Sequence, residues 1–237
     1  MRDLNLLKNP RTKIFDLEIS GPLAMFGTPT SKQSCEMISY PMPTYSALCG
    51  IMRHIYYRPG IKWEIEKCRI MNEVDYYSIP IKAPHYKQKS LKEKMNHPPI
   101  FVYSYLQNVR YQIRAFYVVD ESFFKDTHGY CSYMHDDEIE ERIMFGPEKM
   151  VWLGKTHSST ADIRPCRFGE RESYYDSLGR SEEIYMFHSF IFDKNCWDRS
   201  ITDIGFCRQY AENGVIDFSN IDVYYQSVKK AGGEDKC

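Results

Sequence analysis

Several common catalytic signatures are missing from this 237-residue sequence. It has no phosphate-binding GxxxxGK[ST], no dinucleotide-binding GxGxxG, no HExxH of zinc proteases and no GxSxG nucleophile motif. The enzyme classes that depend on these motifs are therefore excluded. Any chemistry that the chain performs is expected to be metal-independent.

Patterns for metal binding and for membrane insertion are missing as well. The eight cysteines have irregular spacings, with no CxxC and no Cys/His pairs at zinc-ligand spacing. No apolar run approaches the roughly 18 residues of a membrane span, and the N-terminus has no signal-peptide pattern. We expect no structural metal, no cofactor and no membrane association. The expected protein is cytoplasmic, with free thiols.

The sequence also has little net charge. The formal net charge is -1, so no global electrostatic field attracts nucleic acid, and any basic surface has to be local. Aromatic residues are plentiful, with 19 Tyr and 13 Phe. This abundance suits a β-rich chain, and it equally suits a surface on which bases stack.

The stretch PMPTYSALCGIMRHIYYRPG, residues 41–60, predicts a helix over about 44–57, with Thr44 as its N-cap. The spacing of its apolar residues predicts one buried stripe, formed by Leu48, Ile51, Met52 and Ile55. The last turns carry an unusual polar and aromatic set, namely Arg53, His54, Tyr56 and Tyr57. Tyr56 lies at the edge of the stripe and is expected to be half-buried with its hydroxyl in water, and Tyr57 is expected to be more exposed.

Outside this helix, the first two thirds of the sequence predict several strands and a second helix. Alternating patterns predict strands over 12–20, 61–74 and 101–120. Residues 21–41 and 75–99 are rich in Gly or Pro and are expected to be irregular. The second helix is predicted over about 136–145, with acidic first turns on a solvated face and Gly146-Pro147 after its end.

With one more strand within 150–168, this order predicts an α+β fold built on a ferredoxin-like (RRM-like) βαββαβ domain. After about residue 156 the signals are mainly β. We therefore expect a ferredoxin-like domain over residues 1–155, followed by a small antiparallel β-rich domain over residues 156–237 with a loose tail.

Two basic features are compatible with RNA contact. The lysine-rich run from Lys82 to Lys94 can bind a phosphate backbone, or it can simply be a solvent-exposed loop. The strand at 101–120 has a packed face (Tyr111, Ile113, Ala115 and Tyr117) and a basic face (Arg110, Gln112 and Arg114). The basic face can clamp RNA, or it can be an amphipathic strand under a loop. The residues alone leave both alternatives open.

The stretch GPLAMFGTP…SYPMPTYSALCGIMRHIYYRPGIKWEIEKCRIMN resembles the Cas5 family of CRISPR-associated proteins. It is most similar to the branch found in type I-C systems. Three later segments also lie where that branch has similar sequences, namely YLQNVRYQIRAFY, FGPEKMVWLG and PCRFGERESYYDSLG. The resemblance therefore covers about residues 13–217. It implies a ferredoxin-like domain of the repeat-associated RNA-binding superfamily, followed by a small β domain.

The resemblance also implies a function. Members of this branch bind the repeat-derived 5′ handle of the guide RNA, alongside backbone and large subunits of a type I surveillance complex, and cut the precursor RNA. A Tyr, Lys, His trio is associated with the cut. The tyrosine corresponds to Tyr56, and the Lys-His pair corresponds to Met134 and His135, so the lysine is replaced. Lys125, His128, Arg53 or Arg58 are the candidates to supply the missing cation. The acidic residues at 136–141 are expected to raise the pKa of His135 and to repel a phosphate.

We therefore predict a guide-RNA-binding subunit that acts as a metal-independent endoribonuclease. The expected catalytic residues are Tyr56, His135, Lys125 and His128. The expected RNA-binding residues are Arg53, Arg58, Tyr57, Lys87, Lys89, Arg110 and Arg114. Two alternatives stay open, a non-catalytic subunit that binds the handle while a separate nuclease cuts, and a general RNA-binding ferredoxin-like module.

Overall fold

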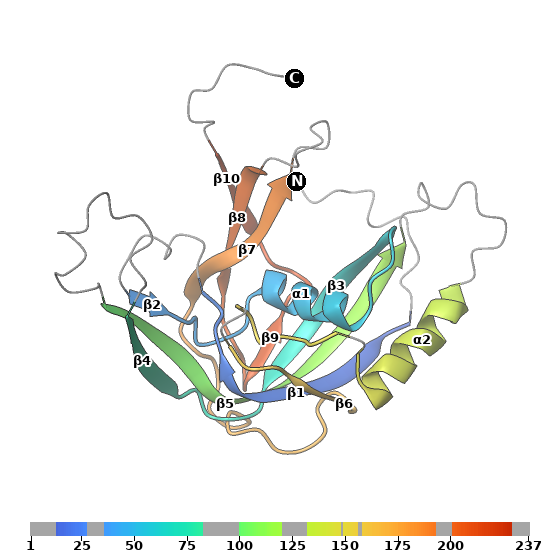
Figure 1. Ribbon diagram of the computed structural model, residues 1–237, viewed down its shortest axis with the longest axis horizontal. Helices are drawn as coiled ribbons and strands as arrows, with labels where there is room; N and C mark the ends of the chain where they lie inside the picture. Colours follow the sequence, from blue (N-terminus) through green and yellow to red (C-terminus); the bar gives the residue numbers. More distant parts are fainter. Residues whose placement is uncertain are drawn as a thin grey trace, which may run out of the picture.

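The computed structural model describes residues 13–27, 36–82, 100–119, 132–147, 149–155, 158–192 and 201–228. In this part of the chain the fold is mixed α+β and consists mostly of strands (Figure 1). In chain order the elements are β1 (Phe15–Ala24), β2 (Glu36–Ile38), α1 (Tyr45–Ile55), β3 (Ile61–Ile70), β4 (Tyr76–Lys82), β5 (Ile100–Val119), α2 (Ser132–Phe145), β6 (Asp162–Pro165), β7 (Ile184–Phe192), β8 (Ile201–Gln209), β9 (Val215–Asp217) and β10 (Val223–Ser227).

The strands form two sheets. The larger sheet has the order β6-β1-β5-β3-β9, and every neighbouring pair on this path is antiparallel. The long strand β5 continues beyond this path, where β4 and β2 pair with its first residues. The smaller sheet has the order β10-β8-β7. The smaller sheet lies within residues 156–237, whereas β6 and β9 of the same range pair into the larger sheet, and the domain division at residue 155 stays a prediction.

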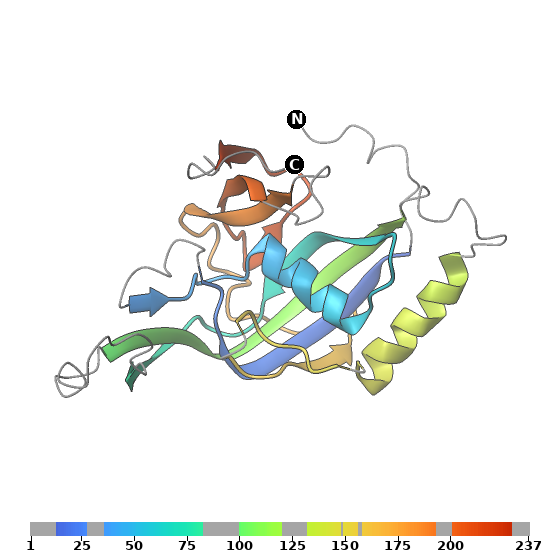
Figure 2. The same cartoon turned by 45° about the horizontal axis from the view of Figure 1, so that its top comes forward.

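Helix α1 lies across one face of the larger sheet, and α2 lies beside the sheet (Figure 2). The predicted N-cap is confirmed, because Thr44 Oγ1 accepts a hydrogen bond from the Ala47 N–H at 3.2 Å. The predicted stripe is also confirmed, since Leu48, Ile51, Met52 and Ile55 are all buried. Burying these four side chains contributes most of the free energy that holds α1 on the sheet, at about 1.5–3 kcal/mol each.

The packed face of β5 is confirmed as well. Tyr111, Ile113, Ala115 and Tyr117 are all buried. At its C-terminal end Tyr117 packs with Phe15 of β1 and Trp63 of β3, with ring centroids 5.8–6.2 Å apart. This aromatic cluster ties the three central strands together close to the C-terminal end of α1.

Two predictions of irregular structure are wrong in part. Residues 76–82 form β4, although residue 80 is a proline. Strand β4 pairs with β5 alone among the described strands, and a proline is tolerated on such an edge because no second neighbour needs its missing N–H. In the predicted loop at 21–41, β1 continues to Ala24, and residues 36–38 form β2. Residues 28–35 of that loop lie outside the described residues.

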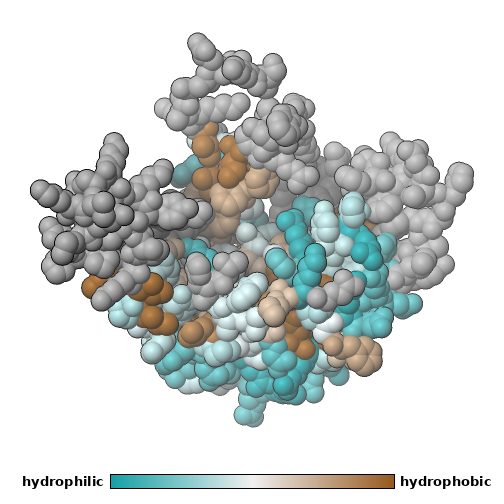
Figure 3. Space-filling view, in the orientation of Figure 1, coloured by the Kyte–Doolittle hydropathy of each residue, from teal (hydrophilic) through white to brown (hydrophobic). Residues whose placement is uncertain are grey.

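Apolar side chains gather at two places on the surface shown in Figure 3, around β4 and on the smaller sheet. Near β4 these include Ile81 and Ile100, and on the smaller sheet Phe192 and Tyr224 are about half exposed. Among the described residues, neither helix is long and apolar enough to span a bilayer.

Candidate functional site

Tyr56 is the first residue after α1, and its backbone is extended rather than helical. The helix ends here because Pro59 follows closely and because Tyr56 is fixed on both sides. The Tyr56 N–H donates to Met52 O at 2.9 Å, and the Trp63 indole N–H donates to Tyr56 O at 2.9 Å. Tyr56 has no exposed surface, so it is more deeply buried than expected. These contacts fix the direction in which the phenol ring points.

His135 reaches the same place from α2. The helix is anchored by Ile139 and Ile143, which are buried, and by the Tyr117 hydroxyl, which donates to Asp136 Oδ1 at 2.7 Å. Its acidic outer face is held by an ion pair between Lys13 and Glu140. The side chain of His135 is half-buried.

The two predicted catalytic residues meet although they are 79 positions apart. The Tyr56 hydroxyl is hydrogen-bonded to Nδ1 of His135, and their ring centroids lie 5.7 Å apart with an edge-on geometry. The same hydroxyl donates to Oε2 of Glu138 at 3.0 Å. A phenol, an imidazole and a carboxylate are therefore joined in one hydrogen-bonded chain, which we call the Tyr56–His135 site.

Two arginines complete this site. Arg58 and Arg142 both donate to Oε1 of Glu138, at 3.0 and 2.8 Å. Their guanidinium groups also lie over the ring of Tyr56, at 5.4 and 5.2 Å from its centroid. The side chain of Arg58 is 49% exposed and that of Arg142 only 14%. Arg58 therefore presents positive charge to solvent, whereas Arg142 mainly holds the site together.

Burial and neighbouring charge set the protonation states. Burial, together with the hydrogen bond to Glu138, raises the pKa of Tyr56 to about 12, so its phenol stays protonated at neutral pH. Burial opposes the charge of Glu138, but hydrogen bonds from Tyr56 and Arg142 nevertheless lower the pKa of that carboxyl. Glu138 is therefore a carboxylate at neutral pH.

The expectation of a raised pKa for His135 is wrong. Burial lowers the pKa of His135, and the charge of Arg58 lowers it further, while Glu138 and Asp136 act in the opposite direction without overcoming these effects. The sequence shows the acids but not the burial of the ring or the arginine beside it. His135 is consequently a neutral imidazole near pH 7.

Sequence reasoning missed Glu138 and Arg142. The acidic residues of α2 read as a solvated face, and that interpretation is wrong at Asp136 and Glu138, which are half-buried and accept hydrogen bonds from Tyr117 and Tyr56. A signal existed in the spacing, because a glutamate four residues before an arginine on a helix forms an ion pair. That signal alone does not reveal that the pair packs against a tyrosine from α1.

The other predicted residues are distributed unevenly. Arg53, Tyr57 and Arg58 are exposed at or just beyond the last turn of α1, beside the Tyr56–His135 site, and Tyr57 is 60% exposed as expected. The remaining loop residues, Lys87, Lys89, Lys125 and His128, lie outside the described residues.

The basic face of β5 is occupied by contacts within the chain. Arg110 pairs with Glu18 at 2.8 Å, and Arg114 makes two hydrogen bonds to Asp16. A loop lies over this face, because the Arg114 guanidinium stacks over the ring of Phe168 at 4.9 Å. The Gly169 N–H donates to the buried Gln112 side chain at 2.9 Å. Of the two alternatives for this face, the geometry matches the strand under a loop.

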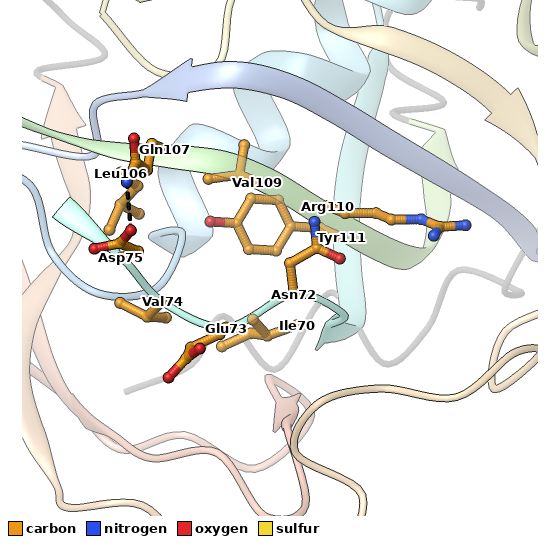
Figure 4. A pocket seen from close by; sticks show the side chains of 10 residues that line it. All are labelled: Ile70, Asn72, Glu73, Val74, Asp75, Leu106, Gln107, Val109, Arg110 and Tyr111. Atoms are coloured by element: carbon orange, nitrogen blue, oxygen red, sulfur yellow. Dashed lines mark hydrogen bonds between the residues drawn. The ribbon is translucent and has the colours of Figure 1, made fainter. Parts of the chain in front are cut away.

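The described pockets lie away from the Tyr56–His135 site. The smaller, shown in Figure 4, is a space of about 10 Å³ lined in part by Tyr111 and Asn72, and beside it the Gln107 N–H donates to Asp75 O at 3.0 Å. It holds at most a single water. The larger, about 270 Å³, is mostly apolar and is lined in part by Met42, Tyr175 and Leu178. Neither of these two pockets is lined by Tyr56, His135 or Glu138.

Chemically, the arrangement offers a neutral imidazole held by a phenol, with an exposed guanidinium near by. An imidazole of this kind can accept a proton from a hydroxyl near pH 7, and a guanidinium can bind a phosphate. Tyr56 cannot act as a base at neutral pH because its pKa is about 12. It can position the imidazole instead.

Comparisons with known proteins agree with this architecture. The family model described as CRISPR-associated protein (Cas_Cas5) matches residues 15–219. A solved structure described as a CRISPR-associated protein is 24% identical, with 90% of this chain and 94% of that chain covered and a TM-score of 0.68. A functionally uncharacterized protein from Streptococcus mutans is 23% identical, with 90% and 95% covered and a TM-score of 0.65. At these identities both likenesses describe the fold alone. Curated protein sequences give no significant match.

Proposed function

Because the chain belongs to the Cas5 family of CRISPR-associated proteins, we propose that it binds the repeat-derived 5′ handle of a guide RNA within a type I surveillance complex. We further propose that it cuts the precursor of that RNA without a metal ion and that it belongs to the type I-C branch. The observation that carries the nuclease proposal is the hydrogen bond between Tyr56 and His135. These are two residues that the family resemblance singles out, and the fold brings Tyr56, at the end of α1, against His135 of α2.

In the proposed reaction a ribose 2′-hydroxyl attacks the adjacent phosphorus. The new P–O2′ bond forms as the P–O5′ bond breaks, which gives a 2′,3′-cyclic phosphate and a 5′-hydroxyl. His135 takes the proton of the 2′-hydroxyl, and the departing 5′ oxygen takes a proton from water. Tyr56 holds the imidazole in place, and Arg58 supplies positive charge to the phosphate in place of the lysine that Met134 replaces.

The proposed RNA path runs over the end of α1. Arg53, Tyr57 and Arg58 are exposed there, next to Tyr56, and an exposed tyrosine beside arginines can stack a base while the guanidinium groups bind phosphates. Lys87 and Lys89 stay part of the proposed RNA-binding set. Arg110 and Arg114 have a smaller part in it than expected, because both are paired within the chain.

We propose the ferredoxin-like arrangement for the larger sheet. Its support is the order β6-β1-β5-β3, with α1 between β1 and β3 in the chain and α2 between β5 and β6. The proposed partners are the guide RNA and the backbone and large subunits of the complex. The apolar side chains exposed around β4 and on the smaller sheet are suited to contacts with such subunits.

A test of this function uses the purified full chain, the cognate repeat hairpin and a scrambled hairpin of the same length, all in EDTA. The proposal expects tight binding of the repeat, a single cut, and products that end in a 2′,3′-cyclic phosphate and a 5′-hydroxyl. A cut that needs a divalent ion, or equal binding of both hairpins, contradicts it. Equal binding points instead to a general RNA-binding module.

One observation favours a second candidate, a subunit that binds the handle without cutting. The Glu138 carboxylate, 32% exposed, lies within the site and engages both nearby arginines, so part of the charge needed by a phosphate is already neutralised. In the EDTA assay, tight and selective binding of the repeat with no product would establish this candidate and exclude the nuclease.

A further inference from the structure

The two carboxylate oxygens of Glu138 have different partners. Oε1 accepts hydrogen bonds from Arg58 and Arg142, at 3.0 and 2.8 Å. Oε2 accepts the hydroxyl of Tyr56 at 3.0 Å. Glu138 is therefore held by the arginines on one side and aimed at the phenol on the other.

Counting protons along this chain of groups indicates which atom donates in the hydrogen bond between Tyr56 and His135. A phenol has a single proton to donate, and an ionised carboxylate has none. If Tyr56 donated to His135, its oxygen and Oε2 of Glu138 would be two acceptors 3.0 Å apart with no proton between them. Tyr56 must therefore donate to Glu138, and the hydrogen bond between Tyr56 and His135 must be donated by Nδ1–H of the imidazole.

We propose that Glu138 is a positioning residue that acts through Tyr56 to hold His135 as the Nδ1–H tautomer, which leaves the basic lone pair on Nε2. This inference rests on the proposed function, in which His135 takes the proton of the 2′-hydroxyl. A buried aspartate has the same relation to the histidine of the Ser-His-Asp triad. Here the phenol of Tyr56 lies between the carboxylate and the imidazole.

The arginines make a sharp test possible through Glu138→Gln. Arg58 and Arg142 need an acceptor at the place of Oε1, so the amide oxygen of the glutamine takes that place. Its NH₂ group then faces Tyr56 and donates to the phenol oxygen. Tyr56 in turn donates to Nδ1, and the proton of the imidazole moves to Nε2. A near-isosteric change thus reverses the whole chain of hydrogen bonds.

The experiment is ¹⁵N NMR of the full chain labelled at histidine, recorded at a pH where His135 is neutral and assigned by the signals lost in His135→Ala. The wild type is expected to carry the proton on Nδ1, and Glu138→Gln is expected to carry it on Nε2. Glu141→Gln is the matched control, because Glu141 is exposed on the same helix and loses the same charge. It should leave the tautomer unchanged. An Nε2–H form in the wild type overturns the proposal without any variant, and an unchanged tautomer in a folded Glu138→Gln also overturns it.

Cleavage of the repeat RNA in EDTA adds a functional readout. Glu138→Gln is expected to lower the single-turnover rate by at least about 10²-fold, the usual contribution of one proton-transfer group, with RNA affinity little changed. Glu141→Gln is expected to cut at the wild-type rate. If the wild type cuts and carries Nε2–H, this inference alone fails. If the wild type does not cut at all, the nuclease proposal fails, and with it any catalytic role for Glu138, whatever tautomer is found.

Discussion

Arg114 on β5 and Asp16 on β1 form an ion pair through two parallel hydrogen bonds, Nε to Oδ1 at 2.8 Å and Nη2 to Oδ2 at 2.9 Å. The Phe168 N–H donates to the same carboxylate at 3.1 Å, so the loop that contains Phe168 is attached to this face of the sheet. A guanidinium engaged in this way is not available to a phosphate. We therefore propose that the arginines of this chain divide into those that hold the fold, such as Arg114, and those that bind RNA, such as Arg58.

This division predicts different effects for two arginine variants. Arg58→Ala should weaken binding of the repeat RNA and reduce the slope of log K against log salt by about 1, because one phosphate contact is lost. Arg114→Ala should leave affinity and slope nearly unchanged and should instead lower the free energy of unfolding by about 1–3 kcal/mol, because Asp16 loses its partner. Fluorescence anisotropy at several salt concentrations measures the binding, and urea denaturation measures the stability. An Arg114→Ala protein of normal stability that loses RNA binding would contradict the division.

The lowered pKa of His135 sets the pH dependence that we expect for the proposed cleavage. Burial and Arg58 favour the neutral imidazole over the opposing charges of Glu138 and Asp136. A neutral base is required, so activity should be retained as pH falls to 6.5 and lost only as pH falls through the lower pKa of the folded protein. Single-turnover rates from pH 4.5 to 8 measure this acid limb. A midpoint at or above 6.5 is the contrary result.

The same shift has a consequence for stability. A folded-state pKa below the unfolded value of about 6.5 means that the unfolded chain binds more protons in this range. The contribution of His135 to stability is therefore present above pH 6.5 and is lost as pH falls through the folded pKa. Urea unfolding at pH 7 and pH 5 should show a larger loss for the wild type than for His135→Ala. An equal loss of unfolding free energy in the wild type and in His135→Ala would argue against a lowered pKa of His135.

Two glycines with the same backbone φ angle are expected to differ greatly in how much a Gly→Ala substitution lowers the free energy of unfolding. Gly146 and Gly154 both have φ of 99°, a conformation that disfavours an L side chain. A Cβ on Gly146, after the end of α2, would meet nothing within 4 Å, whereas a Cβ on Gly154 would lie 2.0 Å from Met25 O. We expect Gly146→Ala to cost about 1–2 kcal/mol of unfolding free energy. Gly154→Ala should cost more than about 3 kcal/mol, because backbone atoms cannot move aside. Urea denaturation compares the two, and similar costs would refute the close approach.

That close approach gives a physical reason for the glycine at the end of FGPEKMVWLG, one of the segments that resemble the family. Gly154 ends FGPEKMVWLG, and two hydrogen bonds join this region to Met25, the residue after β1: Met25 N donates to Leu153 O at 2.9 Å, and Lys155 N donates to Met25 O at 3.1 Å. The backbones of the two segments therefore come too near each other for any side chain at residue 154. The sequence alone shows the glycine and not the backbone of Met25 that it faces.

How much of the molecule the sequence predicts depends on how local the physical cause is. Helix α1 follows from Thr44 and the stripe that ends at Ile55, because capping and periodicity act within one helix. The ion pairs that Arg110 and Arg114 form do not follow, because their partners Glu18 and Asp16 lie on another strand more than ninety residues away in the sequence and the covering loop comes later still. Strand β4 was missed because a proline signals a break in the sequence, and only the sheet shows that it lies on an edge.

In the candidate site, too, some residues could be predicted from the sequence and others could not. Tyr56 and His135 could be named because the family resemblance marks their positions. The structure shows a hydrogen bond between them, and their catalytic role stays a prediction. The roles of Glu138 and Arg142 depend on how α2 packs against the end of α1. Arg142 bonds Glu138 within its own helix, but it also donates to Ile55 O at 3.4 Å, a contact that no local pattern encodes.

The most direct test of the central claim is a side-by-side cleavage assay of the cognate repeat hairpin in EDTA with wild type, Tyr56→Phe, His135→Ala and the control Glu141→Gln. We predict that wild type and Glu141→Gln produce the 2′,3′-cyclic phosphate end at the same rate. His135→Ala should lose cleavage by at least about 10²-fold, and Tyr56→Phe should lose much of it, while both still bind the hairpin. Full cleavage by the folded His135→Ala protein would show that the Tyr56–His135 site does not cut RNA.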